Sequence, residues 1–342
     1  MIKSYTTQFL AIGLIAMMSC KSSTTTDDKS TAKKDNPEKS DFPKVIDVDT
    51  FLKNTDFVVS PDKTFPENKN IVYTPTLIAA WDTLVKGTKN QLVMTSYGED
   101  YLLLEKGRKY ITALDAKDYT ATYKEFRRAK IITTASFKKL LPFKIPFVQT
   151  QDLAFKQKPI QSFGMKHTIE GMYEYLNVDY YKSNTDFIIS ITPADSTQEI
   201  ILVKGDKTSQ NFTAVMKRIE DLRKVSAKSK NYTDHISDEP LKIPKIIFNL
   251  KKNFQSLVDQ SFDYDDLPWG IDTARQRTAF ILDEKGAKVE SEAKIVATPR
   301  GAAAVSPREF IFDTDFYIIL RDKRKTYPYF GLKIVDDELL VK

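Results

Sequence analysis

Apolar side chains recur every three and four residues in two stretches of the chain, and this period is typical of amphipathic helices. Residues 76–85 and 211–225 show it, so a helix is predicted for each. Weaker patterns predict three further segments: a short N-terminal helix at 44–57 capped by Asp49 or Thr50, a polar helix or turn at 118–128, and a short helix at 249–259.

Runs of β-branched and aromatic residues between turn signals predict the strands. They are 70–75, a pair around Gly98 within 91–104, 109–114, a buried strand at 130–137, a central strand at 187–192, 200–203, 241–248, and a closing hairpin of 310–321 with 329–335. Helices and strands follow one another without a regular βαβ alternation. The pattern therefore predicts the α+β class.

One stretch, residues 274–300, combines two patterns. A predicted strand, 278–282, leads into an acidic turn that ends at Gly286. The next residues alternate strictly between small or apolar side chains (Ala287, Val289, Ser291, Ala293) and charged ones (Lys288, Glu290, Glu292, Lys294). Period-two alternation indicates a strand with one buried face. It ends in an Ala-rich run around Arg300 and Gly301.

Composition narrows the function classes. The 342 residues are 41% hydrophobic, which is enough for one large domain or two small ones. The net charge is +6, but basic and acidic residues are interleaved, which favours a mixed solvated surface over a nucleic-acid site. One cysteine excludes a disulfide framework and a thiolate zinc site.

The single cysteine stands at the end of an apolar run near the N-terminus. A basic start, an apolar core too short to span a bilayer and Ser19-Cys20 resemble a bacterial lipoprotein signal. We therefore expect a signal peptide at 1–19, lipidation at Cys20, a disordered tether at 20–41 and one folded domain at 42–342. An ordinary secretory signal is the alternative. The expected location is the bacterial cell envelope, exported and anchored to a membrane, with the outer membrane favoured.

Catalytic and metal-binding patterns are absent from the sequence. His167 and His235 have no second histidine or acid at metal-ligand spacing, so structural or solvated roles are expected. The acidic run 263–266 lacks the spacing and glycine of a calcium loop, and a solvated loop is the favoured interpretation. No glycine-rich phosphate loop or serine elbow occurs. We expect no enzyme activity, no metal and no cofactor.

The order of several short motifs over residues 45–342 resembles the serpin family. The motifs are Asn70-Ile71-Val72-Tyr73-Thr74-Pro75, the strand 131–137 followed by Pro142-Phe143, Thr150 and Phe155, Leu241-Lys242-Ile243-Pro244-Lys245, Asp266-Leu267-Pro268-Trp269-Gly270-Ile271, Asp283-Glu284-Lys285-Gly286, the strand 312–320, and Phe330-Gly331-Leu332-Lys333. The resemblance is carried by their order, because no single motif is decisive.

The resemblance implies a serpin-like fold with a large mixed sheet, a second sheet and flanking helices. The stretch between Pro75 and Thr134 is far shorter than is usual in the family, so some helices of the first third are expected to be missing. The family's tryptophan after the strand 131–137 is absent. Its asparagine in that strand corresponds to Thr134, and its shutter histidine is replaced by Gln276 or Arg277.

The resemblance also implies a function. Serpins inhibit proteases when a cleaved loop inserts into the large sheet, and Gly286 would be the hinge pivot. Ala287, Val289, Ser291 and Ala293 would face inward, where small residues are needed. Counting along the family's usual loop places the reactive bond between Arg300 and Gly301. Arginine before the bond suits a trypsin-like serine protease. The inhibitor itself is expected to be a monomer.

The sequence leaves three alternatives open. In the first, residues 298–304 are a plain linker between two strands. In the second, the chain is a non-inhibitory serpin-fold lipoprotein that acts as a binding or interaction module. In the third, it is an unrelated α+β lipoprotein.

Overall fold

The structure of the protein, a computed structural model, describes residues 42–126, 130–166, 169–226, 235–236, 239–258, 260–287 and 308–342. All of them lie in one compact unit, Asp41–Lys342. Within these ranges no helix is both long and apolar enough to cross a membrane.

A seven-stranded mixed sheet is the largest layer, with the strand order β12-β13-β14-β22-β23-β3-β2. Its strands are Leu176–Ser183 (β12), Asp186–Ile191 (β13), Gln198–Lys204 (β14), Phe316–Asp322 (β22), Phe330–Ile334 (β23), Asn70–Tyr73 (β3) and Thr55–Phe57 (β2). β14 is buried along its whole length and β13 along nearly all of it. Their near-continuous apolar sequences are typical of strands covered on both faces.

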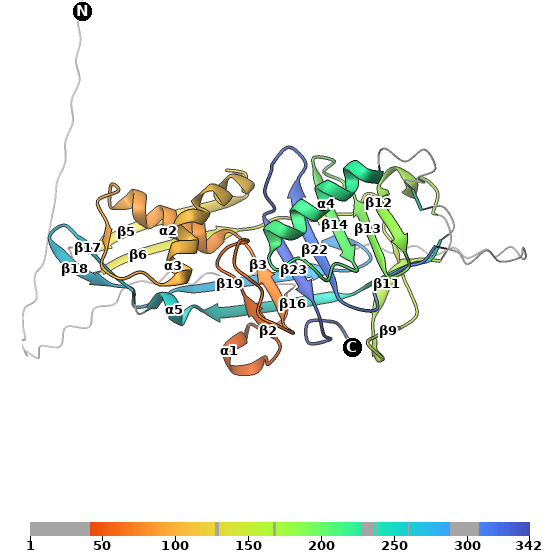
Figure 1. The fold of residues 1–342 in the computed structure, drawn as a ribbon, viewed down its shortest axis with the longest axis horizontal. Coiled ribbons are helices and arrows are strands. Elements are labelled where there is room, and N and C mark those ends of the chain that lie inside the picture. Colours follow the sequence, from red (N-terminus) through yellow and green to blue (C-terminus); the bar gives the residue numbers. More distant parts are fainter. Residues whose placement is uncertain are drawn as a thin grey trace, which may run out of the picture. The chain divides into compact units, whose positions relative to one another are not determined.

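Helix α4, Phe212–Ser226, lies across this sheet (Figure 1). Its inner side chains Phe212, Val215 and Ile219 are fully buried, as the spacing predicted. Near its end, the Arg223 guanidinium lies 2.6 Å from a carboxylate oxygen of Asp179 on β12 and 3.0 Å from one of Glu199 on β14. Buried apolar area and ion pairs therefore both hold α4 against the sheet.

Two smaller sheets contact helix α2, Thr76–Gly87. One has the order β1-β16-β19, built from Ile46–Asp47, Ile246–Asn253 and Arg275–Leu282. The other is the antiparallel pair β5–β6, built from Tyr119–Phe126 and Lys130–Phe137. Helix α3, Glu99–Gly107, and the 3-10 helix η1, Arg108–Ala113, also pack on α2.

The remaining elements complete the fold around these layers. They are the four-stranded sheet β21-β15-β11-β8 (Phe310–Ile311, Leu241–Pro244, Ser162–Met165, Val148–Gln149), the sheet β18-β17-β4 (Leu267–Gly270, Ser261–Tyr264, Val93–Met94), the pairs β10–β9 (Lys158–Ile160, Leu153–Phe155) and β20–β7 (Gly286–Ala287, Leu141–Pro142), the helices α1 (Val48–Phe51) and α5 (Gln255–Val258), and the 3-10 helix η2 (Met172–Glu174).

Several predicted elements are confirmed. The α+β class is confirmed by a large mixed sheet, further sheets and few helices. Helices form where residues 76–85 and 211–225 predicted them, and strands form at 70–73, 186–191 and 198–204. The closing hairpin is β22–β23, with Phe316 opposite Ile334.

The predictions for residues 91–126 were largely wrong. Residues 99–107 form helix α3 rather than a strand, and it begins after Gly98, whose N–H donates to the Gln260 side chain at 3.0 Å. Residues 108–113 form a 3-10 helix in which Tyr110 is buried and donates its hydroxyl hydrogen to Asp62. Residues 119–126 form β5, because pairing with β6 and the high β propensity of Tyr and Thr outweigh their polarity.

Two further predictions need correction. Residues 44–57 contain only the four-residue helix α1, capped by Asp47, because their ends pair with neighbouring strands. Residues 249–259 begin as a continuation of β16, which ends at Asn253, and the helix is only Gln255–Val258.

β6 has the predicted bounds but is not a buried strand. Its residues alternate between partly buried and exposed, because α2 covers one face only. On the other face, hydroxyl groups pair across the strands, Thr120 with Ser136 at 2.8 Å and Thr122 with Thr134 at 2.7 Å. Among the described helices, none covers this outer face of β5–β6, which agrees with the shortened first third.

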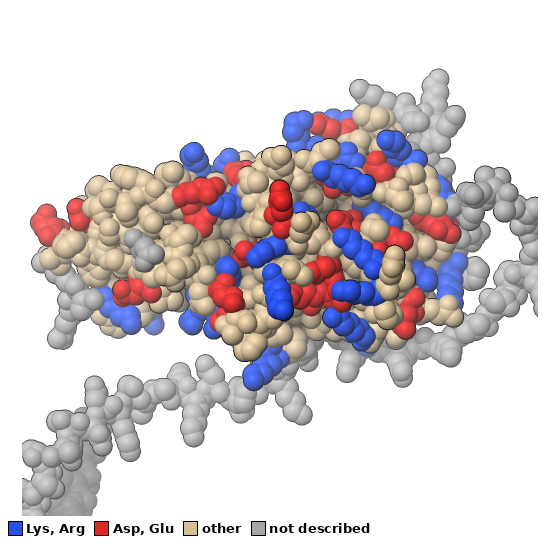
Figure 2. Space-filling model, turned by 60° about the horizontal axis from the view of Figure 1, so that its bottom comes forward, with Lys and Arg blue, Asp and Glu red and all other residues tan. Residues whose placement is uncertain are grey.

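Basic and acidic side chains are interspersed over much of the face shown in Figure 2. This agrees with the mixed solvated surface that their interleaving along the sequence predicted.

Candidate hinge and strand-acceptor site

Gly286 occupies a backbone conformation that requires glycine. β19 ends at Leu282, and a tight turn follows in which the Gly286 N–H donates to the carbonyl of Asp283 at 3.2 Å. The φ angle of Gly286 is +102°. A Cβ atom there would lie 2.5 Å from the Phe143 backbone nitrogen and 2.6 Å from the Leu141 carbonyl oxygen. A side chain would therefore both strain the turn and collide with neighbouring backbone.

The segment after the turn is paired with the chain that follows β6. In the antiparallel pair β20–β7, Gly286 lies opposite Pro142 and Ala287 opposite Leu141. The Phe143 N–H donates to the Lys285 carbonyl at 3.1 Å, and the Phe147 N–H donates to that of Glu284 at 2.9 Å. The predicted pivot is therefore the point at which the loop leaves a short ladder beside β6.

An ion pair joins this turn to the edge of the neighbouring sheet. The Lys245 Nζ, between β15 and β16, lies 2.7 Å from a carboxylate oxygen of Glu284, and the two side chains are 11% and 23% exposed. Burial opposes ionisation of Glu284, but the ammonium group of Lys245 outweighs it and holds the pKa of Glu284 below its usual value. Burial raises the pKa of the neighbouring Asp283.

Three phenylalanines form an aromatic cluster next to the hinge. Phe143 and Phe147 meet edge to face with ring centroids 5.0 Å apart, and Phe163 lies 6.2 Å and 5.9 Å from them. All three are buried. The cluster therefore packs the chain that follows β6 against β11.

Two strand edges beside the hinge have no ladder among the described residues. β19 pairs with β16 on one side only, and β6 pairs with β5 on one side only. Both strands pack on the same end of β23, since Phe280 of β19 stacks on Phe330 at 4.5 Å and Phe137 of β6 lies 5.4 Å from Tyr329. Unpaired edges present backbone N–H and C=O groups that another strand can use.

Of the two residues predicted to replace the family's shutter histidine, Gln276 is buried and Arg277 is exposed. Gln276 is buried and its Nε2 donates to the Thr74 hydroxyl at 2.5 Å, which ties β19 to the start of α2. Its Oε1 is buried without a hydrogen-bond partner in the described part of the chain. Arg277 points to the other face, where it donates to Asn249.

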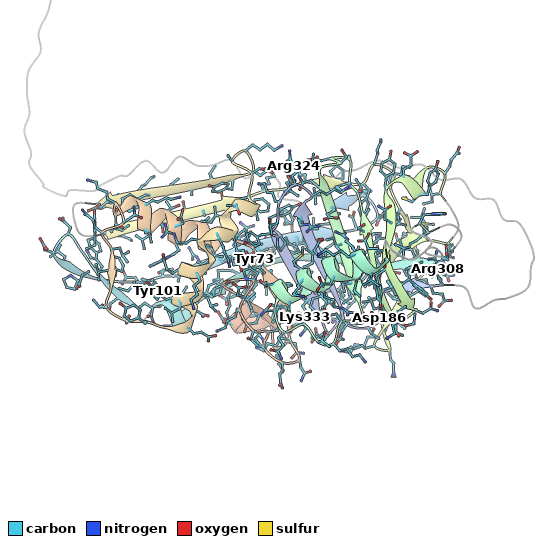
Figure 3. All side chains as sticks on the ribbon, turned by 45° about the horizontal axis from the view of Figure 1, so that its top comes forward. Tyr73, Tyr101, Asp186, Arg308, Arg324 and Lys333 are labelled. Carbon is cyan, nitrogen blue, oxygen red and sulfur yellow. The ribbon has the colours of Figure 1, made fainter. Side chains whose placement is uncertain are left out.

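The far end of the loop is anchored at Arg308 (Figure 3). Its guanidinium donates to Glu239 at 2.6 Å and lies over the rings of Tyr181 and Phe310, 5.6 Å and 5.5 Å from their centroids. The buried Lys204 continues this anchor, since its Nζ lies 2.6 Å from the Ile311 carbonyl oxygen. The described residues on both sides of residues 288–307 therefore lie in well-packed backbone.

Most of the predicted site residues lie outside the described residues. These are Cys20, Val289, Ser291, Ala293, Arg300 and Gly301, and His167 is among them too. Gly286 and the backbone of Ala287 are described and form the strand β20, and their role as a hinge stays a prediction. In the described ranges no group of three or more His, Cys, Asp or Glu is placed to hold a metal ion.

Sequence reasoning missed Lys245 and Glu284 as partners. Both residues stood in motifs of the serpin resemblance, Leu241-Lys242-Ile243-Pro244-Lys245 and Asp283-Glu284-Lys285-Gly286. Neither motif says which residue the other will contact, so only the tertiary structure shows the pair.

No protein-family model and no curated protein matches the sequence. Among solved structures, a serpin from the trematode Schistosoma haematobium is 13% identical and has a TM-score of 0.46, covering 79% of this chain and 94% of that chain. The thermophilic serpin Tengpin in the native state is 10% identical with a TM-score of 0.45, covering 83% and 97%. A Manduca sexta serine protease inhibitor, Serpin-12, is 14% identical with a TM-score of 0.37, covering 60% and 56%. These similar structures are serpins, the family that the motif order in the sequence predicted.

Proposed function

We propose that this protein is a serpin-like inhibitor of a trypsin-like serine protease, with the bond between Arg300 and Gly301 as the bait. Cleavage would free the segment after Gly286, which would insert between β6 and β19 and carry the acylated protease with it. One observation carries the proposal: the hinge already pairs with β7, next to two strand edges that lack a partner among the described residues.

The register of the hinge supports insertion. If the pairing of Gly286 with Pro142 continued without interruption, residues 291–298 would lie opposite residues 137–130, the full length of β6. Arg300 would then fall just beyond the end of the strand. The bait would thus lie two residues beyond the partner of Lys130, the first residue of β6.

The same register places small side chains inward. Residues directly opposite in an antiparallel pair share a face. Ser291 and Ala293 would face α2 with the partly buried Phe137 and Ala135, and Glu292 and Lys294 would face solvent with Ser136 and Thr134. A new strand adds backbone hydrogen bonds and covers partly exposed apolar surface, so the inserted state would be the more stable one.

Trypsin provides the direct test. Incubation with a slight molar excess of inhibitor should produce an adduct that survives boiling in detergent and is absent with Arg300→Gln. Arg324→Gln, which changes an exposed arginine outside residues 286–301, should retain the adduct. Cleavage after Arg300 with no adduct would refute inhibition and leave the non-inhibitory interaction module.

We propose in addition that the mature chain is exported and anchored to the bacterial envelope by a lipid on Cys20, facing its protease as a monomer. The Ser19-Cys20 step after a short apolar run supports this. Metabolic labelling with a palmitate analogue should mark the wild-type chain and not Cys20→Ser. Labelling of both, or of neither, would contradict it.

A further inference from the structure

A cavity of about 560 Å³ lies where four parts of the fold meet. They are helix α1, strand β2 with the loop that follows it, the start of helix α3, and the end of β16 with helix α5 (Figure 1). The exposed residues Gln255 and Ser256 are part of its lining, so it opens to solvent. Its volume falls within the range of roughly 300–1,000 Å³ that is typical of small-molecule sites.

One part of the cavity lining is apolar. Phe57 of β2, the next two residues Val58 and Val59, and Phe254 after β16 all border it, and each is between 2% and 6% exposed. Apolar surface of this kind favours a ligand with an apolar body, because contact removes apolar area of both molecules from water.

Two lysines border the same cavity, and carboxylates hold both of them. The Lys252 Nζ lies 2.5 Å from an oxygen of Asp49 and 3.0 Å from one of Asp56. The Lys63 Nζ lies 3.1 Å from an oxygen of Asp100. Burial opposes the charge of both lysines, but their carboxylate partners outweigh it and raise the pKa of each, so both are ammonium groups at neutral pH.

Both kinds of charge keep hydrogen-bonding capacity for a ligand. An ammonium group has three N–H donors, and a carboxylate has about four acceptor sites. Lys252 contacts two carboxylates, and Lys63 also contacts two, since Glu99 lies 2.5 Å from its Nζ. Asp49 accepts from Lys252 and from the Asn253 N–H, the latter at 3.2 Å. Each ammonium group therefore has a third donor, and Asp49 has further acceptor sites, that these contacts leave available.

We propose that this cavity binds a zwitterion with an apolar side chain, namely a free apolar amino acid or a short peptide. The ligand's carboxylate would accept the third N–H of a lysine, and its ammonium group would donate to an aspartate of the lining. Its apolar side chain would lie against the phenylalanines and valines.

Ligands with a single charge fit this lining less well. Three aspartates and two lysines border the cavity, so an anion would meet the aspartates and a cation would meet the lysines. A zwitterion adds no net charge and can satisfy both kinds of group at once. The mixed charges of the lining are therefore the observation that selects the ligand class.

This proposal goes beyond protease inhibition and does not depend on it. Neither Gly286 nor β7 is among the described residues that line the cavity. Binding is thus measurable in a chain that inhibits nothing. The cavity exists only when its four parts come together in the folded chain, so a ligand should also raise the unfolding midpoint.

Isothermal titration calorimetry of the full chain tests the proposal with four probes. L-phenylalanine and the dipeptide leucyl-phenylalanine are zwitterions, and the tighter binder of the two identifies a free amino acid or a peptide as the preferred source. Phenethylamine lacks the carboxylate, and 3-phenylpropionate lacks the ammonium group. Each of these two should bind at least about tenfold more weakly than L-phenylalanine, because it loses charge-assisted hydrogen bonds.

Two single variants assign the binding to this cavity. Lys252→Gln and Lys63→Gln should each weaken binding of the better zwitterion by about tenfold. The matched control Lys217→Gln also removes a lysine that is paired with an aspartate, but on the exposed side of α4, and should bind like wild type. Circular dichroism spectra check that the variants are folded. The comparison of the four probes needs only the wild-type chain.

Three results overturn the proposal. Absence of binding of both zwitterions at millimolar concentration would exclude the site. Equal affinity for either single-charge probe would show that the paired charges are not recognised together. Full affinity in the folded Lys252→Gln and Lys63→Gln variants would place the zwitterion elsewhere on the protein.

Discussion

The seven-stranded sheet and the sheets beside the hinge use the same element in opposite ways. β14 is buried at every residue and paired on both edges. Among the described residues, β6 is half-exposed along its length and is paired with another strand on one edge only. The first arrangement leaves nothing to gain by rearrangement, whereas the second leaves backbone groups and apolar surface that one more strand would satisfy. One domain can therefore combine a fully paired, buried sheet with a sheet that has an open edge.

Of the changes proposed here, cleavage after Arg300 should have the largest effect on stability, because it would fill the open edge of β6. Trypsin cleavage after Arg300 should raise the unfolding midpoint by at least about 10 °C, because insertion completes the open sheet at a gain of several kcal/mol. Differential scanning calorimetry before and after cleavage measures it. In Ala293→Trp, which adds no trypsin site, the same cleavage should give no rise, since a large inward side chain overpacks the acceptor. A cleaved wild-type protein with an unchanged midpoint would mean that β6 and β19 accept no strand.

The second largest effect should come from truncating core residues, which should cost more stability in the seven-stranded sheet than in β6. Leu202→Ala, in the middle of β14, should lower the free energy of unfolding by about 3–4 kcal/mol, because it leaves a cavity in a fully buried layer. Ile132 lies on the outer face of β6 and is 37% exposed, so Ile132→Ala should lower the free energy of unfolding by less than about 1 kcal/mol. Urea denaturation gives both values. Equal losses would show that the two sheets are packed alike.

Loss of the ion pair between Lys245 and Glu284 should lower the free energy of unfolding by less than truncation of a core residue and by more than loss of a surface ion pair. Glu284→Gln should lower the free energy of unfolding by about 1–3 kcal/mol, since it leaves Lys245 half-satisfied in a mostly buried position. The double variant that combines Glu284→Gln with Lys245→Met should lose less free energy of unfolding than the sum of the losses in the two single variants. Lys217→Gln removes an exposed pair with Asp221 and should cost less than about 0.5 kcal/mol. Strict additivity at Lys245 and Glu284 would contradict the contact.

The pH dependence of the turn should show the smallest effect. Because the pKa of Glu284 is lowered in the folded chain, its contribution is present above the unfolded value of about 4.3 and is lost as pH falls through the folded pKa. The pKa of Asp283 is raised by burial, so its effect has the opposite sign, and stability falls as pH rises from about 3.9 through its folded pKa. Urea midpoints between pH 3 and 7 should flatten at the acid end in Glu284→Gln and rise near neutrality in Asp283→Asn. If the curves of both variants overlay that of the wild type, neither Glu284 nor Asp283 contributes to the pH dependence of stability.

Predictability from sequence differed between regions for a physical reason. β3, β13, β14, α2 and α4 were found because their residues are buried by a large partner, and burial imposes a strict apolar period on the sequence. Residues 91–126 were misassigned because they lie at the surface, where the pattern is weak. There, the Gly98 contact with Gln260 and the pairing of β5 with β6 decide between helix and strand.

The candidate site divides in the same way. The sequence by itself determined the α+β class and the alternation of small and charged residues after Gly286, because these are local properties of neighbouring residues; that Gly286 is a hinge stays a prediction. Only the tertiary structure decided that Gly286 pairs with Pro142 of β7, that Lys245 meets Glu284, that Gln276 is buried, and that β6 lies open on one face and one edge among the described residues. Each of these is a contact between segments far apart in the chain, and such contacts depend on how the layers pack rather than on any local pattern.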